Sequence, residues 1–219
     1  MAKDASRRLP AEERRAQLVA AALGLAEAEG FGAVTIRRVA DAAGVSLGVV
    51  HYCFESKEEL MGAAIANVVA ALGEEISQTY ARASEASEAG TGAEGLRQLL
   101  GDGLAAMWAL IEQTPQLQIL TYEITTYALR LAAENPDGSR ALADRQYQVT
   151  QAVATEFLQN SAEHCRMRWT RPVESVGRLA LTMIDGVALR WLIDRDSEAA
   201  GAALDELVDL VVAKAEPAD

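Results

Sequence analysis

The sequence is poor in the residues that disulfide-linked, loop-rich or membrane-embedded proteins need. Its 219 residues include only 2 cysteines and 5 prolines, and 5% are aromatic. Two cysteines, Cys53 and Cys165, cannot build a disulfide framework and are typical of a reducing cytoplasm. The longest apolar runs, such as residues 18–22, are far shorter than the ~20 residues that cross a bilayer. The first fifteen residues lack the apolar core of a signal peptide. We therefore predict a cytoplasmic protein without a membrane segment.

The abundant residues favour helices. Half of the residues are hydrophobic, 24% are charged and 43 are alanine. Alanine, leucine, glutamate and arginine all have high helix propensity. We predict an all-α protein with about nine helices, placed by apolar periodicity and capping residues.

The charge is distributed unevenly along the chain. A net charge of −12 argues by itself against a nucleic-acid partner. Residues 1–60, however, hold 8 basic and 9 acidic residues and contribute only −1, whereas residues 61–219 contribute −11. The acidity therefore belongs to the C-terminal part, and the N-terminal part remains compatible with binding to DNA.

Capping residues and apolar spacing predict four helices at the start of the chain. We expect them over residues 11–29, 36–43, 46–54 and from 56 onward. Thr35, Ser46 and Ser56 can each cap the helix that follows, and Gly30 ends the first helix.

The middle two helices have the spacing of a helix-turn-helix. A steep crossing needs a small residue at the contact, which Ala40 supplies. It also needs a turn position that tolerates positive φ, which Gly44 supplies. The apolar residues that can bury the pair against the first helix are Val39, Ala43, Val45 and Val50.

The stretch from Thr35 to Leu60 resembles a known family signature. It reads TIRRVADAAGVSLGVVHYCFESKEEL and contains the pieces T-x-R-x-[IVL]-A, A-G-V-S-x-G and Y-x-F-x-x-K-E-x-L. These pieces are similar to the DNA-binding signature of the TetR-type (tetracycline-repressor-like) transcriptional regulators. His51 and Cys53 depart from the residues that the family commonly has there. The resemblance implies a helix-turn-helix DNA-binding domain over 1–60 and a helical effector-binding and dimerisation domain over 61–219.

The residues around the predicted recognition helix have side chains suited to DNA. The helix is short enough to enter a major groove end-on, and its N-terminal amides favour phosphate oxygens. Leu47 and Val49 present methyl groups that can contact thymine, while Arg37 can bind guanine O6 and N7 or a phosphate. The predicted DNA-binding residues are Thr35, Arg37, Arg38, Ser46, Leu47, Gly48, Val49, His51, Tyr52 and Lys57.

Five further helices are expected after the fourth, which continues to about residue 83. The first of them follows a Thr91/Glu94 capping box and runs to about 113, and the others cover 114–135, 139–165, 172–194 and 197–215, with a turn at residues 135–138. The last two have broad apolar faces that suit a four-helix homodimer interface. The predicted interface residues are Val176, Ala180, Val187, Trp191, Leu204, Leu207, Val208 and Val211. The alternative is that these faces only complete the core of a single chain.

The middle helices hold much of the scarce aromatic and sulfur chemistry. Apolar walls with a few polar tips are typical of a small-molecule pocket, although core packing uses the same residue types. The predicted effector-binding residues are Met107, Trp108, Ile111, Tyr122, Glu123, Tyr127, Tyr147, Gln151 and Met183.

The sequence lacks G-x-S-x-G, P-loop, C-x-x-C and H-E-x-x-H motifs, so we predict no enzyme activity, cofactor or metal site. We predict instead a homodimeric, ligand-responsive DNA-binding regulator, a repressor that a small-molecule effector releases from a palindromic double-stranded DNA operator. The alternative is a helical ligand-binding or protein-interaction module without specific DNA binding.

Overall fold

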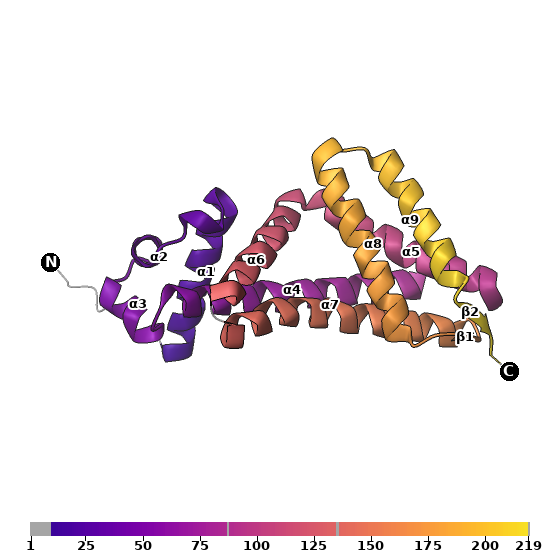
Figure 1. The fold of residues 1–219 in the computed structure, drawn as a ribbon, viewed down its shortest axis with the longest axis horizontal. Helices are drawn as coiled ribbons and strands as arrows, with labels where there is room; N and C mark the ends of the chain where they lie inside the picture. Colours follow the sequence, from indigo (N-terminus) through magenta and orange to yellow (C-terminus); the bar gives the residue numbers. More distant parts are fainter. Residues whose placement is uncertain (1–9, 87, 135, 219) are drawn as a thin grey trace. The chain divides into compact units, whose positions relative to one another are not determined.

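Helices make up most of the structure, as the composition predicts (Figure 1). A computed structural model describes residues 10–86, 88–134 and 136–218, with side chains described except at 128 and 131–146. Within these residues there are nine α-helices, one short 3-10 helix and two short strands. The predicted all-α class is confirmed.

The helices of the N-terminal part are α1 (Ala11–Glu29), η1 (Phe31–Ala33), α2 (Ile36–Ala43), α3 (Leu47–Cys53) and α4 (Lys57–Ala86). The later helices are α5 (Gly92–Gln113), α6 (Pro115–Glu134), α7 (Pro136–His164), α8 (Val173–Asp194) and α9 (Ser197–Val212). The expected boundaries agree to within a few residues, with one exception. Because α7 begins at Pro136, the turn predicted over 135–138 is wrong for 136–138, and residue 135 lies outside the described residues.

Two short strands, β1 (Met167–Trp169) and β2 (Ala215–Pro217), replace parts of the expected helices or loops. They pair antiparallel, with Met167 opposite Pro217 and Trp169 opposite Ala215. Beyond the strand ends, Thr170 N–H donates to the carbonyl of Lys214 (2.8 Å) and Ala218 N–H donates to that of Arg166 (2.9 Å). The pairing fixes the end of the chain beside the segment that follows α7.

The described residues group into two compact units. The first comprises Met1–Val68 and Leu120–Leu142, and the second comprises Val69–Ile119 and Ala143–Asp219. Three helices, α4, α6 and α7, contribute residues to both. By length and composition alone α4 could cross a membrane, but the core helices of soluble proteins have the same composition. The division into domains at residue 60 stays a prediction.

In the first unit, α1, α2 and α3 pack around fully buried side chains that include Leu18, Val39, Val50 and Phe54. Only two residues of α2 and two of α3 are buried, so most positions of these two short helices are partly or fully exposed.

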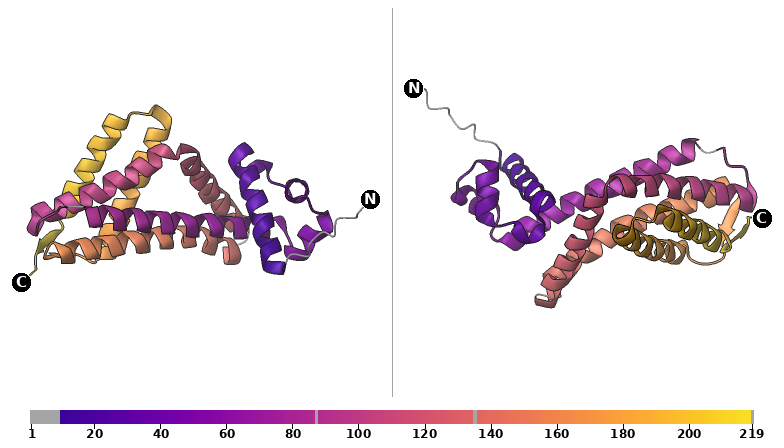
Figure 2. Two further views of the ribbon diagram at one scale, coloured as in Figure 1. Left: turned by 180° about the vertical axis from the view of Figure 1, so that it is seen from behind. Right: turned by 90° about the horizontal axis from the view of Figure 1, so that it is seen from above.

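The second unit has its own core, formed mainly by α5, α8 and α9. Helices α8 and α9 lie side by side in each view (Figures 1 and 2). Trp108 of α5 and Trp191 of α8 meet edge to face, with ring centroids 5.7 Å apart. Such edge-to-face pairs are favourable because the positive edge of one ring meets the negative face of the other.

Candidate DNA-binding surface and effector cavity

The start of α2 is fixed by its capping residue. Thr35 has an extended backbone, and its hydroxyl accepts a hydrogen bond from the N–H of Arg38 at 3.3 Å. This bond satisfies one of the amides that have no partner within the helix. The capping role predicted from the sequence is confirmed, and it orients the exposed Arg37 on the first turn.

The turn between α2 and α3 depends on Gly44. This residue is left-handed, with φ 68° and ψ 32°, and its N–H donates to Ala40 and Asp41 carbonyls at the end of α2. A residue with a Cβ would be strained in this conformation, whereas glycine adopts it at little cost. The turn therefore directs α3 away from α2 as the helix-turn-helix spacing predicts.

The short helix α3 has distinct inner and outer faces. Val50 and Cys53 are buried against α1 and α2, while His51 and Tyr52 face outward and the Tyr52 side chain is 82% exposed. Leu47, at the first position, is also exposed. The exposed leucine, histidine and tyrosine of this short helix leave apolar and hydrogen-bonding groups open to a partner. Ser46 precedes α3, but its side chain makes no capping bond.

The two arginines of α2 have different environments. Arg37 is exposed and makes no ion pair or hydrogen bond with the described residues. The Arg38 guanidinium instead pairs with both carboxylate oxygens of Glu29 and donates to the carbonyl of Ala33 (3.1 Å). This pair lowers the pKa of Glu29 and raises that of Arg38. Arg38 therefore links α2 to α1 and is less available than Arg37 to a phosphate.

Two residues of α1 that the sequence analysis did not single out hold the domain together. The guanidinium of Arg15 lies over the Phe54 ring, 4.1 Å from its centroid, and pairs with Glu59 at 2.9 Å. Gln17 donates to the carbonyl of Ala43 at 3.1 Å, at the end of α2. These contacts tie α1 to the end of α2 and to the segment that follows α3, and no local sequence motif signals them.

A carboxylate of α6 completes the first unit. Glu123 accepts a hydrogen bond from the N–H of Phe31 at 3.1 Å. Tyr127, one turn later, packs against the Phe31 ring at 5.7 Å between centroids. Gly30 has φ 83°, and a Cβ there would lie 3.6 Å from the Glu123 oxygens. The loop between α1 and α2 is thus anchored to α6.

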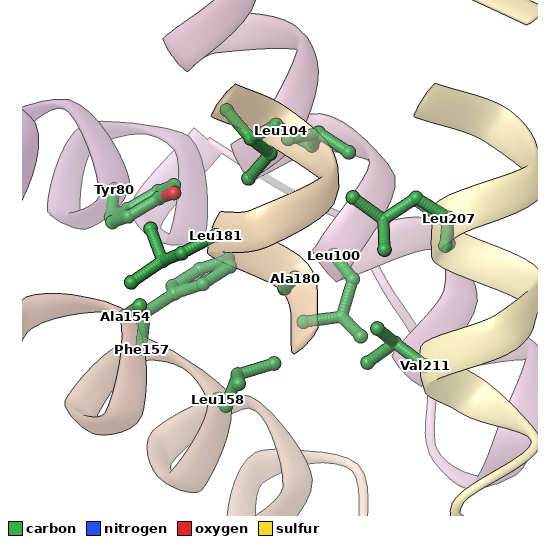
Figure 3. Close-up of a pocket in the computed structure, with 12 residues that line it drawn as sticks. Tyr80, Leu100, Leu104, Ala154, Phe157, Leu158, Ala180, Leu181, Leu207 and Val211 are labelled. Carbon is green, nitrogen blue, oxygen red and sulfur yellow. The ribbon is translucent and has the colours of Figure 1, made fainter. Parts of the chain in front are cut away.

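The second unit contains an apolar cavity of about 50 Å³ (Figure 3). Its walls come from α4, α5, α7, α8 and α9, and the labelled side chains point toward one another in the close-up. Tyr80 is its single polar residue. The Tyr80 hydroxyl is buried and donates to the sulfur of Met107 at 3.1 Å, and burial raises the pKa of this tyrosine.

Comparisons with known proteins agree with this geometry. Residues 18–64 match the family described as bacterial regulatory proteins, tetR family, and they span most of α1, the helix-turn-helix and the start of α4. This helix-turn-helix part of the chain belongs to the TetR family. The chain is also 26% identical, over 92% of its length and 95% of the relative, to the HTH-type nicotine-responsive transcriptional repressor HdnoR of Paenarthrobacter nicotinovorans.

Solved structures of other TetR-family proteins have the same fold. A TetR-family transcriptional regulator from Mesorhizobium loti MAFF303099 superimposes with a TM-score of 0.70 at 17% identity, covering 95% of this chain and 99% of that one. FadR of Thermus thermophilus, a TetR-family repressor in complex with lauroyl-CoA, gives 0.56 at 24% identity, covering 90% and 93%. The TetR family is one of transcriptional regulators, so the interpretation as a module without specific DNA binding is not favoured.

The structure of this TetR-family chain separates the predicted effector-binding residues. Tyr122, Glu123 and Tyr127 belong to the first unit, and the other six to the second. None of the nine lines the apolar cavity. Met107 and Trp108 are buried in the core, Ile111 and Met183 pack against it, Tyr147 is half-exposed, and Gln151 donates to Thr155 and to the carbonyl of Glu174. Apolar type and helical spacing indicated a core-facing position but not which core residues border a cavity.

The predicted dimer-interface residues pack mostly inside this single chain. Val176, Trp191, Leu204, Leu207, Val208 and Val211 are buried, and Ala180 and Val187 are half-buried. Four of the eight, Ala180, Leu207, Val208 and Val211, line the cavity. The burial therefore favours the alternative interpretation for these faces, that they complete the core of the chain. The same two helices leave other apolar residues open: Leu179, Leu189 and Ile193 on α8 and Leu210 on α9.

Proposed function

We propose that this TetR-family chain is a ligand-responsive repressor, released from a palindromic DNA operator by a small-molecule effector. The observation that carries the proposal is the capped helix-turn-helix, whose outward residues lie within or beside the stretch that matches the family. We assign DNA binding to residues 1–60, effector binding and dimerisation to residues 61–219, and the cytoplasm as its location.

The outward residues divide into two proposed roles. Arg37, which has no hydrogen-bond or ion-pair partner among the described residues, would bind a guanine edge or a phosphate. The exposed Leu47 and Tyr52 would contact bases or sugar in the major groove. Lys57, at the first position of α4, is half-buried and would hold a phosphate. The net charge of −11 on residues 61–219 opposes contact between DNA and any other part of the chain.

The open face of α8 is the proposed dimer interface. Leu179, Gly186, Leu189 and Ile193 recur at spacings of three, four and seven along the helix, and all four are exposed. Such a stripe is the pattern by which two helices pack across a symmetry axis, and a small residue lets them approach closely. A dimer would present two copies of α3 to major grooves about 34 Å apart.

An effector would act by shifting a population. It must bind the conformation that releases DNA more tightly than the conformation that holds it, and a preference of about 1.4 kcal/mol changes operator affinity only tenfold. Helix α6 offers a path within the chain, because it starts in the second unit and carries Glu123, the acceptor of the Phe31 N–H, in the first.

The proposal is tested by titrating the purified chain against the intergenic DNA upstream of its own gene, with an unrelated duplex as control, at two salt concentrations. We expect tight binding to its own DNA that persists at the higher salt. Equal and strongly salt-sensitive binding to both duplexes would indicate phosphate contacts alone. Binding to neither duplex would contradict the proposal.

Arg37→Ala tests the proposed contact directly. We expect operator binding to weaken by about 1–3 kcal/mol, with a relaxed preference at one base pair. The matched control is Arg171→Ala, an exposed arginine of the second unit, which should leave operator affinity unchanged. A uniform loss across all sequences would assign Arg37 to the phosphate backbone instead.

Leu189→Glu with Ile193→Glu tests the dimer. Both positions are exposed, so the chain should stay folded while sedimentation shows a monomer with poor operator affinity. Gln98→Glu, an exposed change on α5, serves as the control for added charge. A double variant that remains dimeric would place the interface on another surface.

A further inference from the structure

A second, outer cavity adjoins the apolar one. It has a volume of about 300 Å³, and its mixed lining includes five polar residues: Ser77, Ser84, Glu85, Glu156 and Asn160. All five of these residues are exposed, so this cavity opens to solvent. Tyr80 and Phe157 line both the inner and the outer cavity. These two aromatic residues therefore lie on the boundary that the two cavities share.

The two rings at this boundary form a stacked pair. The ring of Tyr80, from α4, lies parallel to that of Phe157, from α7, with centroids 4.1 Å apart and planes inclined by 7°. Figure 3 shows both rings at the edge of the inner cavity, with Leu104 and Leu181 nearby. Because one ring belongs to α4 and the other to α7, a change in the packing of these two helices would separate the rings.

The inner cavity is too small to hold a ligand while the rings stay stacked. Its volume of about 50 Å³ compares with the ~150 Å³ of a protein cavity that accommodates benzene. The outer cavity, of about 300 Å³, adds enough space for the pair to reach the lower end of small-molecule sites, roughly 300–1,000 Å³. Occupation by a ring-sized molecule therefore requires that the rings part.

The polar groups of the two cavities favour a cation. Glu85 and Glu156 form no ion pair with the described residues, and no lysine or arginine lines either cavity. The net charge of −11 on residues 61–219 adds to the attraction for positive charge.

The Tyr80 hydroxyl is a second polar feature that points to a ligand. Tyr80 is more than nine-tenths buried and lines the inner cavity, yet its hydroxyl donates only to the thioether sulfur of Met107. A thioether is a weak acceptor, so an oxygen or nitrogen of a ligand would be a better partner for this hydroxyl. The inner chamber thus offers apolar walls and one hydrogen-bond donor.

We propose that the Tyr80–Phe157 pair is a gate, and that the effector is an amphipathic amine that opens it. The apolar body of the molecule occupies the inner cavity, and its protonated nitrogen stays in the outer cavity with Glu85 and Glu156. This inference rests on the proposed function, because it gives the effector of that regulator its chemical class.

The test is calorimetric titration of the full chain, without DNA, with 4-phenylbutylamine and with its uncharged counterpart 4-phenylbutanol. The two probes share the apolar body and differ in the charged end. We expect the amine to bind more tightly than the alcohol by up to about tenfold, since an exposed ion pair contributes a factor of about five or less and two carboxylates are available to the amine.

Two variants assign the binding to the gate and its carboxylates. Glu85→Gln with Glu156→Gln should remove most of the tenfold preference for the amine, while Glu206→Gln, an exposed change on α9, should preserve it. Ala154→Leu fills the inner cavity and should weaken both probes. Thermal melting checks that each variant is folded, and the glutamine variants decide the question if Ala154→Leu does not fold.

The outcomes separate this inference from the proposed function. Equal affinity for amine and alcohol, or no binding of either at millimolar concentration, would overturn the amine gate while leaving operator binding intact. Tight binding of the amine to the parent chain, weakened in the glutamine variants, would support the amine gate even if the chain failed to bind operator DNA. If the variant with both glutamine substitutions still preferred the amine over the alcohol, the amine gate would also be overturned.

Discussion

Replacing Gly103 with alanine is expected to destabilise the chain, although the same change at Gly101 should stabilise it. Both glycines lie inside α5, where alanine has the higher helix propensity by roughly 0.5–1 kcal/mol. They differ in what a new Cβ would meet. At Gly101 nothing lies within 4 Å, whereas at Gly103 the Cβ would stand 2.4 Å from Cζ of Phe157.

The magnitude follows from this contact. A separation of 2.4 Å between carbon atoms is impossible, and the atoms on both sides of Cζ are also within 3.1 Å, so the whole ring must move. Because the ring is stacked on Tyr80, its displacement also breaks that pair. Overpacking of this kind costs about 1–3 kcal/mol, which exceeds the gain in helix propensity. The net expectation is a loss of up to about 2.5 kcal/mol for Gly103→Ala and a gain of about 0.5–1 kcal/mol for Gly101→Ala.

The assay is urea unfolding of both variants beside the parent chain, followed by circular dichroism. A chain of this size shifts its melting temperature by about 2–4 °C per kcal/mol, so thermal scans should show opposite displacements. Equal stabilisation by the two alanines would refute the reasoning, because it would mean that the Phe157 ring yields without cost.

Three further changes test contacts of the first unit. Thr35→Ala should lower the free energy of unfolding by about 1 kcal/mol through loss of the α2 cap, and Thr35→Ser should restore it, as urea unfolding can measure. Glu123→Ala removes the acceptor of the Phe31 N–H, so amide hydrogen exchange at Phe31 should accelerate, with an unchanged rate contradicting the bond. The Arg38 guanidinium lowers the pKa of Glu29 below its ordinary 4.5, so this pair supports the fold above that pH and is lost as the pH falls through the lowered value. In the Glu29→Gln variant the free energy of unfolding should therefore fall less steeply with decreasing pH below 4.5 than in the parent chain. The same pH dependence in both chains would show that the pair does not contribute.

The helix-turn-helix could be predicted closely because its determinants are local. Thr35 caps the helix that begins at the next residue, and Gly44 occupies the left-handed turn that its lack of a Cβ allows. Both signals concern residues within a few positions of each other. The ties from Arg15 to Phe54 and from Glu123 to Phe31 escaped prediction because each joins residues far apart in the chain.

The cavity could not be found from the sequence for a related reason. The periodicity of α9 predicts an apolar face that must be covered, but it does not say what covers it. Leu207, Val208 and Val211 turn toward the cavity within the chain. Tyr80 and Phe157 become a pair only through the packing of α4 on α7, and neither stands out in its own segment.

The pairing of β2 with β1 has a practical consequence for anyone who shortens the chain. Ending it before Lys214 would take away the acceptor of the Thr170 N–H and the donor to the Arg166 carbonyl, and it would uncover one side of β1. A strand of three residues is not stable without a partner strand. Truncated versions intended for crystallisation or for fusion to a reporter should therefore retain every residue through Ala218, with any joined sequence added beyond it.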